Sequence, residues 1–123
     1  MTVRRRQEGR LSGSFGDIIA NVSVRGFFHE LVDILTHLHE DVEVQYSPVD
    51  IRAEYCGRTI CRIVPYRELV HMQIGDDPVW EVRIRGEAGY LDAVDLIFDV
   101  FLDLVATAGR KPDVYRHRTV LPR

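Results

Sequence analysis

His29, Asp33 and His37 are spaced four residues apart in a segment whose apolar residues recur with a helical period. Side chains four residues apart stack along one face of a helix. Neutral imidazole and carboxylate groups are good zinc ligands, so this row could hold a metal ion. One helix seldom supplies a whole metal site, however, and the same pattern is typical of a solvated helix face. The sequence leaves both interpretations open.

Two cysteines, Cys56 and Cys61, flank a predicted two-residue hairpin turn at Gly57-Arg58. The register of that turn would make them diagonal neighbours, roughly 7–8 Å apart, which is at or beyond the reach of a disulfide. Their spacing also differs from the redox motif C-x-x-C. The pair is interpreted either as two small buried apolar side chains or as thiols with a redox role.

Asp92, Asp95, Asp99 and Asp103 form an acidic stripe along a second predicted helix. No Lys or Arg lies within that helix to pair with them. The stripe is therefore either a solubilising surface or a docking site for the basic ends of this chain or of a second copy.

Charge is distributed unevenly along the 123 residues. Residues 1–25 hold five arginines against two acids, and residues 110–123 hold five basic residues against one acid. Residues 26–109 hold six arginines against sixteen acids. Two basic ends therefore flank an acidic body, and they either fold onto that body or bind something anionic outside it.

The N-terminal arginines Arg4, Arg5, Arg6 and Arg10 could contact the phosphates of a nucleic acid. The acidic body opposes this interpretation because it repels the same phosphate backbone. No dinucleotide-binding, P-loop or nucleophile-elbow motif is present, so the sequence predicts neither a cofactor nor a recognisable catalytic centre.

Apolar periodicity and turn residues predict helices at both ends of a run of strands. The expected helices cover residues 27–41 and 90–108, and the expected strands cover residues 42–46, 49–56, 59–64, 68–74 and 79–85. We therefore predict an α+β fold, in which an antiparallel meander of about five strands packs against two helices in helix–sheet–helix order. The chain is expected to be a single domain, with an arm at 1–16, a folded body at 26–109 and a tail at 110–123.

The predicted strand register gives the sheet apolar side chains on both faces. A β-bulge near Pro65 would flip the register and restore one apolar face. Otherwise the second face is covered by the N-terminal arm or by another copy of the chain. That second face comprises Cys61, Ile63, Val70, Met72 and Ile74.

From these features we expect a non-enzymatic interaction module that forms a homo-oligomer, such as a dimer, through the second sheet face and the acidic stripe. The alternatives are a nucleic-acid accessory protein that uses both basic ends, and a small ligand-binding protein or enzyme. No apolar run approaches the roughly 18 residues of a membrane helix, and no apolar segment of a secretory signal follows the basic N-terminus. We therefore expect no membrane partner and a cytoplasmic location.

Overall fold

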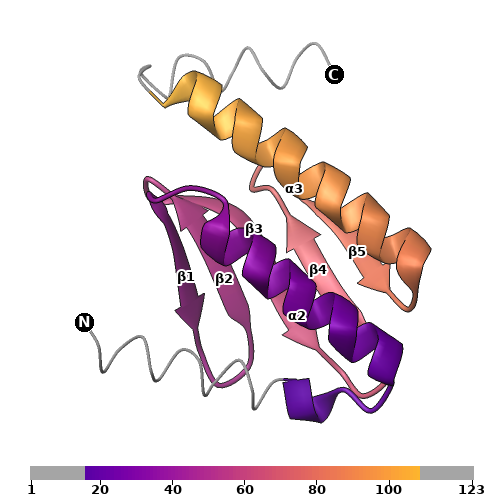
Figure 1. Ribbon diagram of the computed structural model, residues 1–123. Coiled ribbons are helices and arrows are strands. Elements are labelled where there is room, and N and C mark those ends of the chain that lie inside the picture. Colours follow the sequence, from indigo (N-terminus) through magenta and orange to yellow (C-terminus); the bar gives the residue numbers. More distant parts are fainter. Residues whose placement is uncertain (1–15, 109–123) are drawn as a thin grey trace.

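The computed structural model describes residues 16–108, which form a five-stranded antiparallel sheet with two long helices on one of its faces (Figure 1). In chain order the elements are α2 (Val22–His37), β1 (Val42–Tyr46), β2 (Ile51–Tyr55), β3 (Arg58–Pro65), β4 (Val70–Ile74), β5 (Trp80–Ile84) and α3 (Glu87–Thr107). Each strand pairs with the next strand along the chain, so the sheet is a simple meander. The predicted α+β fold and its helix–sheet–helix order are confirmed.

Helix α2 begins at Val22, earlier than the predicted start at residue 27. The Asn21 side chain caps it, because its Oδ1 accepts a hydrogen bond from the Val24 backbone nitrogen at 3.1 Å. Gly26 lies inside the helix, where glycine costs about 1 kcal/mol relative to alanine. The helix continues through it because Val24 and Phe28, on either side, are both fully buried.

The hairpin between β2 and β3 turns at Cys56 and Gly57, one residue earlier than predicted. Tyr55 pairs with Arg58, and the two turn residues have φ of 51° and 79°. Positive φ at both central residues is the pattern of a type I′ turn, whose twist suits a hairpin. Cys56 therefore occupies a left-handed conformation that favours glycine or asparagine.

A β-bulge follows this turn. Glu54 pairs with Thr59 but Ala53 pairs with Cys61, so Ile60 is an extra residue in β3. One extra residue moves the side chains beyond it to the opposite face of the sheet. Of the two alternatives for the second face, the structure thus has a bulge, but at Ile60 and not near Pro65, and this bulge places Ile51 and Ala53 on the same face as Cys61.

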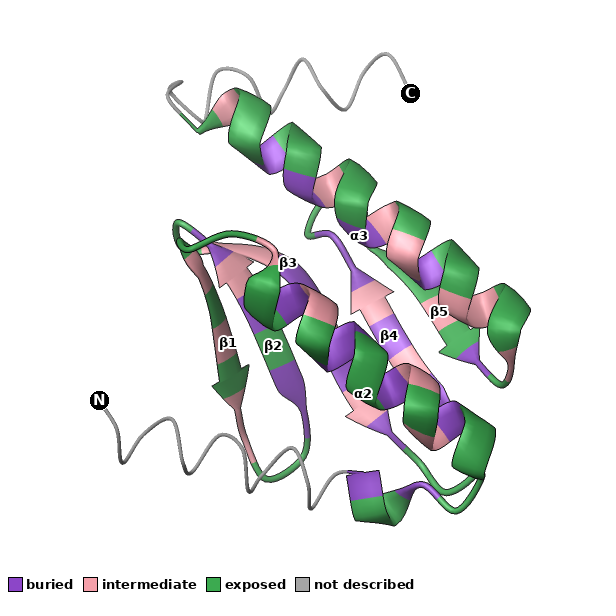
Figure 2. Ribbon diagram, in the orientation of Figure 1, coloured by how far each residue is buried: buried purple, intermediate pink, exposed green. Residues whose placement is uncertain are grey.

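Apart from Val64, the apolar sheet residues therefore share one face, and α2 and α3 cover that face (Figure 2). The five sheet residues predicted to form an exposed interface each have 0% of their surface exposed: Cys61, Ile63, Val70, Met72 and Ile74. Their assignment as an exposed interface is wrong, because they belong to the chain's own core. The opposite face, here called the outer face, is mostly polar. Its strand residues are Glu43, Gln45, Arg52, Glu54, Thr59, Arg62, Val64, His71, Gln73, Glu81 and Arg83.

Candidate functional site

Helix α3 carries two apolar surfaces. One packs on the sheet through Ala93, Ile97, Phe101 and Leu104, which are buried. The other is exposed and is here called the α3 flank. It consists of Leu91, Phe98, Leu102 and Val105, whose exposed fractions lie between 41% and 60%. At about 100° per residue these four side chains fall within one narrow arc of the helix, so the α3 flank is continuous along it.

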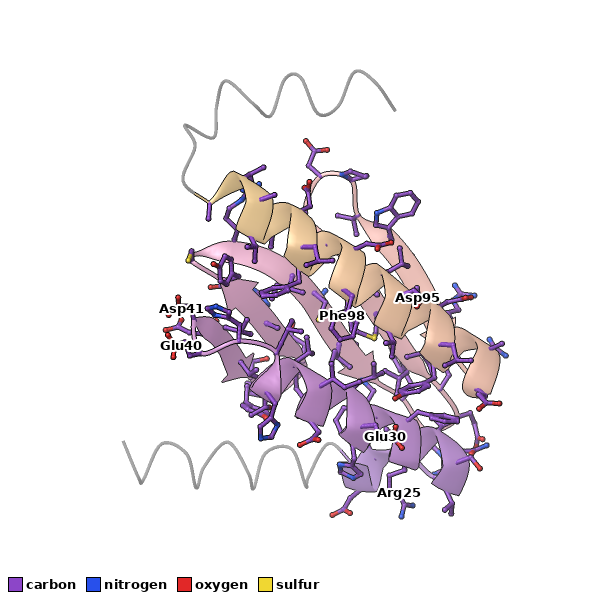
Figure 3. The ribbon with its side chains drawn as sticks, turned by 45° about the horizontal axis from the view of Figure 1, so that its top comes forward. Arg25, Glu30, Glu40, Asp41, Asp95 and Phe98 are labelled. Atoms are coloured by element: carbon purple, nitrogen blue, oxygen red, sulfur yellow. The ribbon has the colours of Figure 1, made fainter. Side chains whose placement is uncertain are left out.

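The α3 flank lies on the side of α3 that is turned toward α2, where Figure 3 places Phe98 between the two helices. The helices run in the same direction (Figure 1). Near their starts, Phe27 stacks on Tyr90 with ring centroids 4.8 Å apart. Beyond the end of α2, the His39 ring lies 5.9 Å from that of Phe101. Phe98 lies between these two aromatic contacts along α3.

Acidic groups border this apolar surface. The four predicted aspartates of α3 are all exposed, and Asp95 is adjacent to the α3 flank on the helix surface (Figure 3). Across from them on α2, Glu30 Oε1 accepts a hydrogen bond from the Tyr90 hydroxyl at 2.7 Å. That hydrogen bond, together with burial, raises the pKa of Tyr90. Among the described residues, no basic side chain forms an ion pair with the α3 aspartates.

A second cluster, here called the Asp50 cluster, lies at the outer face. The Asp50 side chain is only 2% exposed and accepts hydrogen bonds from the Ser47 hydroxyl and from the Nε atoms of Arg52 and Arg62. The Ser47 hydroxyl oxygen also accepts hydrogen bonds from the backbone N–H groups of Val49 and Asp50, at 3.2 Å and 3.1 Å. The cluster therefore fixes the β1–β2 turn and joins it to two neighbouring strands.

The Asp50 carboxyl stays ionised to a lower pH than an ordinary aspartate does. Burial on its own would raise the Asp50 pKa, because it removes water from the charged form. The hydrogen bonds from Ser47, Arg62 and Arg52 outweigh burial, and the Arg62 charge adds to them, so the pKa lies below its ordinary value of 3.8. The buried carboxylate is therefore a permanent anchor for two arginines at neutral pH.

The three residues of the predicted metal row lie on the exposed side of α2. His37 Nδ1 is 3.2 Å from Asp33 Oδ1 and 2.9 Å from the Asp33 carbonyl oxygen, whereas His29 makes no polar contact with either residue. Within residues 16–108, no group of three or more His, Cys, Asp or Glu is arranged to hold a metal ion.

Both cysteines are free thiols. Cys56 is exposed at the hairpin turn, whereas Cys61 is fully buried, and burial raises the pKa of Cys61 to about 12. A thiol with that pKa forms almost no thiolate at neutral pH, so Cys61 is chemically inert in the folded chain.

The nucleic-acid candidates Arg4, Arg5, Arg6 and Arg10 lie outside the described residues, as does the basic segment 110–123. Neither of the two long helices in the described part has the length and hydropathy that a membrane span requires.

Sequence reasoning located the acidic stripe but missed the α3 flank and the Asp50 cluster. The flank is hidden in the sequence because Leu91, Phe98 and Val105 follow the same helical period as the core residues of the predicted helix. The Asp50 cluster depends on a strand register that the bulge at Ile60 alters, although Ser47-Pro48-Val49-Asp50 carried a turn signal.

Comparison with family models, with curated proteins and with solved structures gave no match for this chain.

Proposed function

We propose that this chain is a non-enzymatic interaction module that self-associates as a two-fold dimer through the α3 flank. The observation that carries the proposal is the continuous row of four half-exposed apolar side chains on one helix. Exposed apolar patches on soluble domains commonly mark interaction surfaces. The α3 flank takes the place of the second sheet face, which the chain's own helices cover.

Apolar burial at the α3 flank supports only a weak dimer. The exposed parts of its four side chains amount to about two complete apolar side chains in each copy. Complete burial of one such side chain contributes about 2 kcal/mol, so a two-fold contact contributes about 8 kcal/mol. Lost translational and rotational freedom costs at least about 4 kcal/mol, which leaves an affinity of about 1 mM.

Charge complementarity supplies the remaining stabilisation and fixes the orientation of the two copies. The sequence that follows α3, residues 110–123, holds five basic residues against one acid, whereas α3 itself is acidic and has no basic residue. If two α3 helices pair antiparallel, each basic segment begins beside the first half of the partner helix, where Glu87, Asp92 and Asp95 lie. Parallel pairing would instead bring the two basic segments together. We therefore expect an antiparallel contact with two-fold symmetry.

The test is the molar mass in solution, measured by light scattering coupled to size exclusion at low and high salt. We expect a dimer at low salt that dissociates as salt screens the contact between the basic segments and α3. Leu102→Gln places a polar side chain in the middle of the flank and should give a monomer at both salt concentrations. Val49→Gln is the matched control, because Val49 is also exposed but lies in the β1–β2 turn, and it should leave the dimer intact.

A wild-type chain that stays monomeric at low salt, at a protein concentration of about 0.5 mM, would refute self-association. A dimer that survives Leu102→Gln would refute the α3 flank as its interface.

A further inference from the structure

Arg52 and Arg62 are direct cross-strand partners on the outer face. Like charges directly opposite each other on a sheet are destabilising. Here the buried Asp50 carboxylate lies against both Nε atoms and offsets one of the two positive charges. The three groups together keep a net charge of +1 at neutral pH, and the repulsion between the guanidinium groups is only partly compensated.

Asp50 engages only the Nε atom of each arginine. In the part of the chain that the structure describes, the Nη atoms of Arg52 and Arg62 form no hydrogen bond or ion pair. The arginine side chains are 55% and 38% exposed, so these donors can be reached from solvent. Anchoring through Nε restricts the orientation of both guanidinium planes while leaving their paired terminal nitrogens for another acceptor.

The cross-strand neighbours of Arg52 and Arg62 favour the binding of an anion. Gln45 pairs with Arg52 and Gln73 pairs with Arg62, so each arginine has a neutral amide as its outer neighbour. Glu81 lies beyond Gln73, one strand farther away, and contacts His71 at 3.3 Å. The carboxylate of β2 itself is Glu54, two residues from Arg52, and the Gln45 side-chain amide donates a hydrogen bond to it at 3.5 Å.

We propose that Arg52 and Arg62, held by Asp50, form a binding site for a phosphate group on the outer face of the sheet. Two guanidinium groups on adjacent strands, both reachable from solvent, can donate N–H groups to the oxygens of a tetrahedral oxyanion. Asp50 is the positioning residue, because it holds both arginines and leaves the ligand to their Nη atoms. The site is independent of the α3 flank and lies on the other face of the sheet.

The first probe is inorganic phosphate, titrated into 15N-labelled protein at constant ionic strength set with chloride. We expect saturable shifts of the Arg52 and Arg62 Nε resonances, with a dissociation constant on the order of 1 mM. Arg52→Lys and Arg62→Lys keep the charge but lose the paired donors, and each should weaken binding by about tenfold. Arg83→Lys is the matched control, because Arg83 is an exposed arginine two strands from Arg62 on the same face, and it should leave the affinity unchanged.

A second arm identifies the source of the phosphate. A short single-stranded oligonucleotide that shifts the same Nε resonances at lower concentration than phosphate, and loses this effect in both lysine variants, assigns the site to a nucleic-acid backbone. If inorganic phosphate or pyrophosphate binds and the oligonucleotide does not, the ligand is a small phosphate compound. The absence of saturable shifts with phosphate, pyrophosphate and oligonucleotide alike would overturn the proposal. Equal binding by the wild type and both lysine variants would do the same, because the interaction would then be unspecific charge attraction.

Discussion

Replacing Asp50 by Asn should destabilise the fold more than any other single carboxyl-to-amide change on the outer face. The substitution keeps the shape of the side chain and one oxygen that can accept a hydrogen bond from Ser47. It removes the negative charge that lies between two arginines. Arg52 and Arg62 then face each other across the sheet without a counter-charge.

The magnitude follows from the burial of the three groups. Breaking a fully buried ion pair costs about 3–5 kcal/mol. Asp50 is almost fully buried, but its partners are 55% and 38% exposed and water can solvate them once the carboxylate is gone. We therefore expect Asp50→Asn to lower the free energy of unfolding by about 2 kcal/mol at neutral pH.

The difference in stability between the wild type and Asp50→Asn should depend on pH in a defined direction. The Asp50 pKa is lower in the folded chain than its ordinary value of 3.8. Its contribution to stability is therefore fully present above the unfolded pKa and is lost as pH falls through the folded pKa. The gap between the wild type and Asp50→Asn should be constant from pH 7 to about pH 5 and should shrink as the pH falls below about 4.

The assay is urea unfolding at several pH values, with Glu43→Gln as the control. Glu43 is a carboxylate on the same face of the sheet but it is exposed, so its amide should change stability by less than about 0.5 kcal/mol. Equal stability of Asp50→Asn and the wild type at pH 7 would refute the reasoning. A gap that widened as the pH fell would contradict the assigned direction of the pKa shift.

Gly75 has φ of 92°, and a Cβ there would lie 2.6 Å from the Pro78 carbonyl oxygen, so Gly75→Ala should destabilise the fold by about 3 kcal/mol in urea unfolding. A loss below 1 kcal/mol would mean that the β4–β5 turn relaxes around the methyl group. Cys56→Asn should stabilise the fold by about 0.5–1 kcal/mol, because asparagine tolerates the left-handed conformation better than cysteine does; a decrease in the unfolding midpoint would contradict the turn assignment. A thiol reagent should label Cys56 rapidly in the native chain and Cys61 only on unfolding. Rapid labelling of both cysteines under native conditions would show that the core around Cys61 opens.

The type and order of the elements could be predicted from the sequence because apolar periodicity and turn residues report them directly. Val42 to Tyr46 alternates strictly, and Gly75 to Pro78 marks a turn, so both features have their expected place. The sequence places the start of α2 too late, because Gly26 is typical of the boundary of a helix. The periodicity in fact runs through it, from Val24 to Phe28 and Leu31.

The second sheet face could not be judged correctly from the sequence because one bulge decides it. The bulge alone sets which residues of β2 share a face with those of β3, because moving a two-residue turn by one position shifts the register by two residues. Cysteine is an unusual residue for the first central position of a type I′ turn, so Gly57-Arg58 was the more typical choice. Without the bulge at Ile60, either turn position would split the single core into two apparent apolar faces.

The acidic row of α3 affects the isolated chain and the proposed dimer in opposite directions. Asp95 and Asp99, and likewise Asp99 and Asp103, are like charges four residues apart, and each pair destabilises the helix by about 0.2–0.5 kcal/mol. Salt screens this repulsion and should raise the stability of the monomer. The same salt weakens the attraction between α3 and the basic segment of a partner. If the acidic row only solubilises the chain, salt should stabilise the fold without dissociating a dimer. Dissociation of the dimer at salt concentrations that stabilise the fold would therefore show that the row is a docking site.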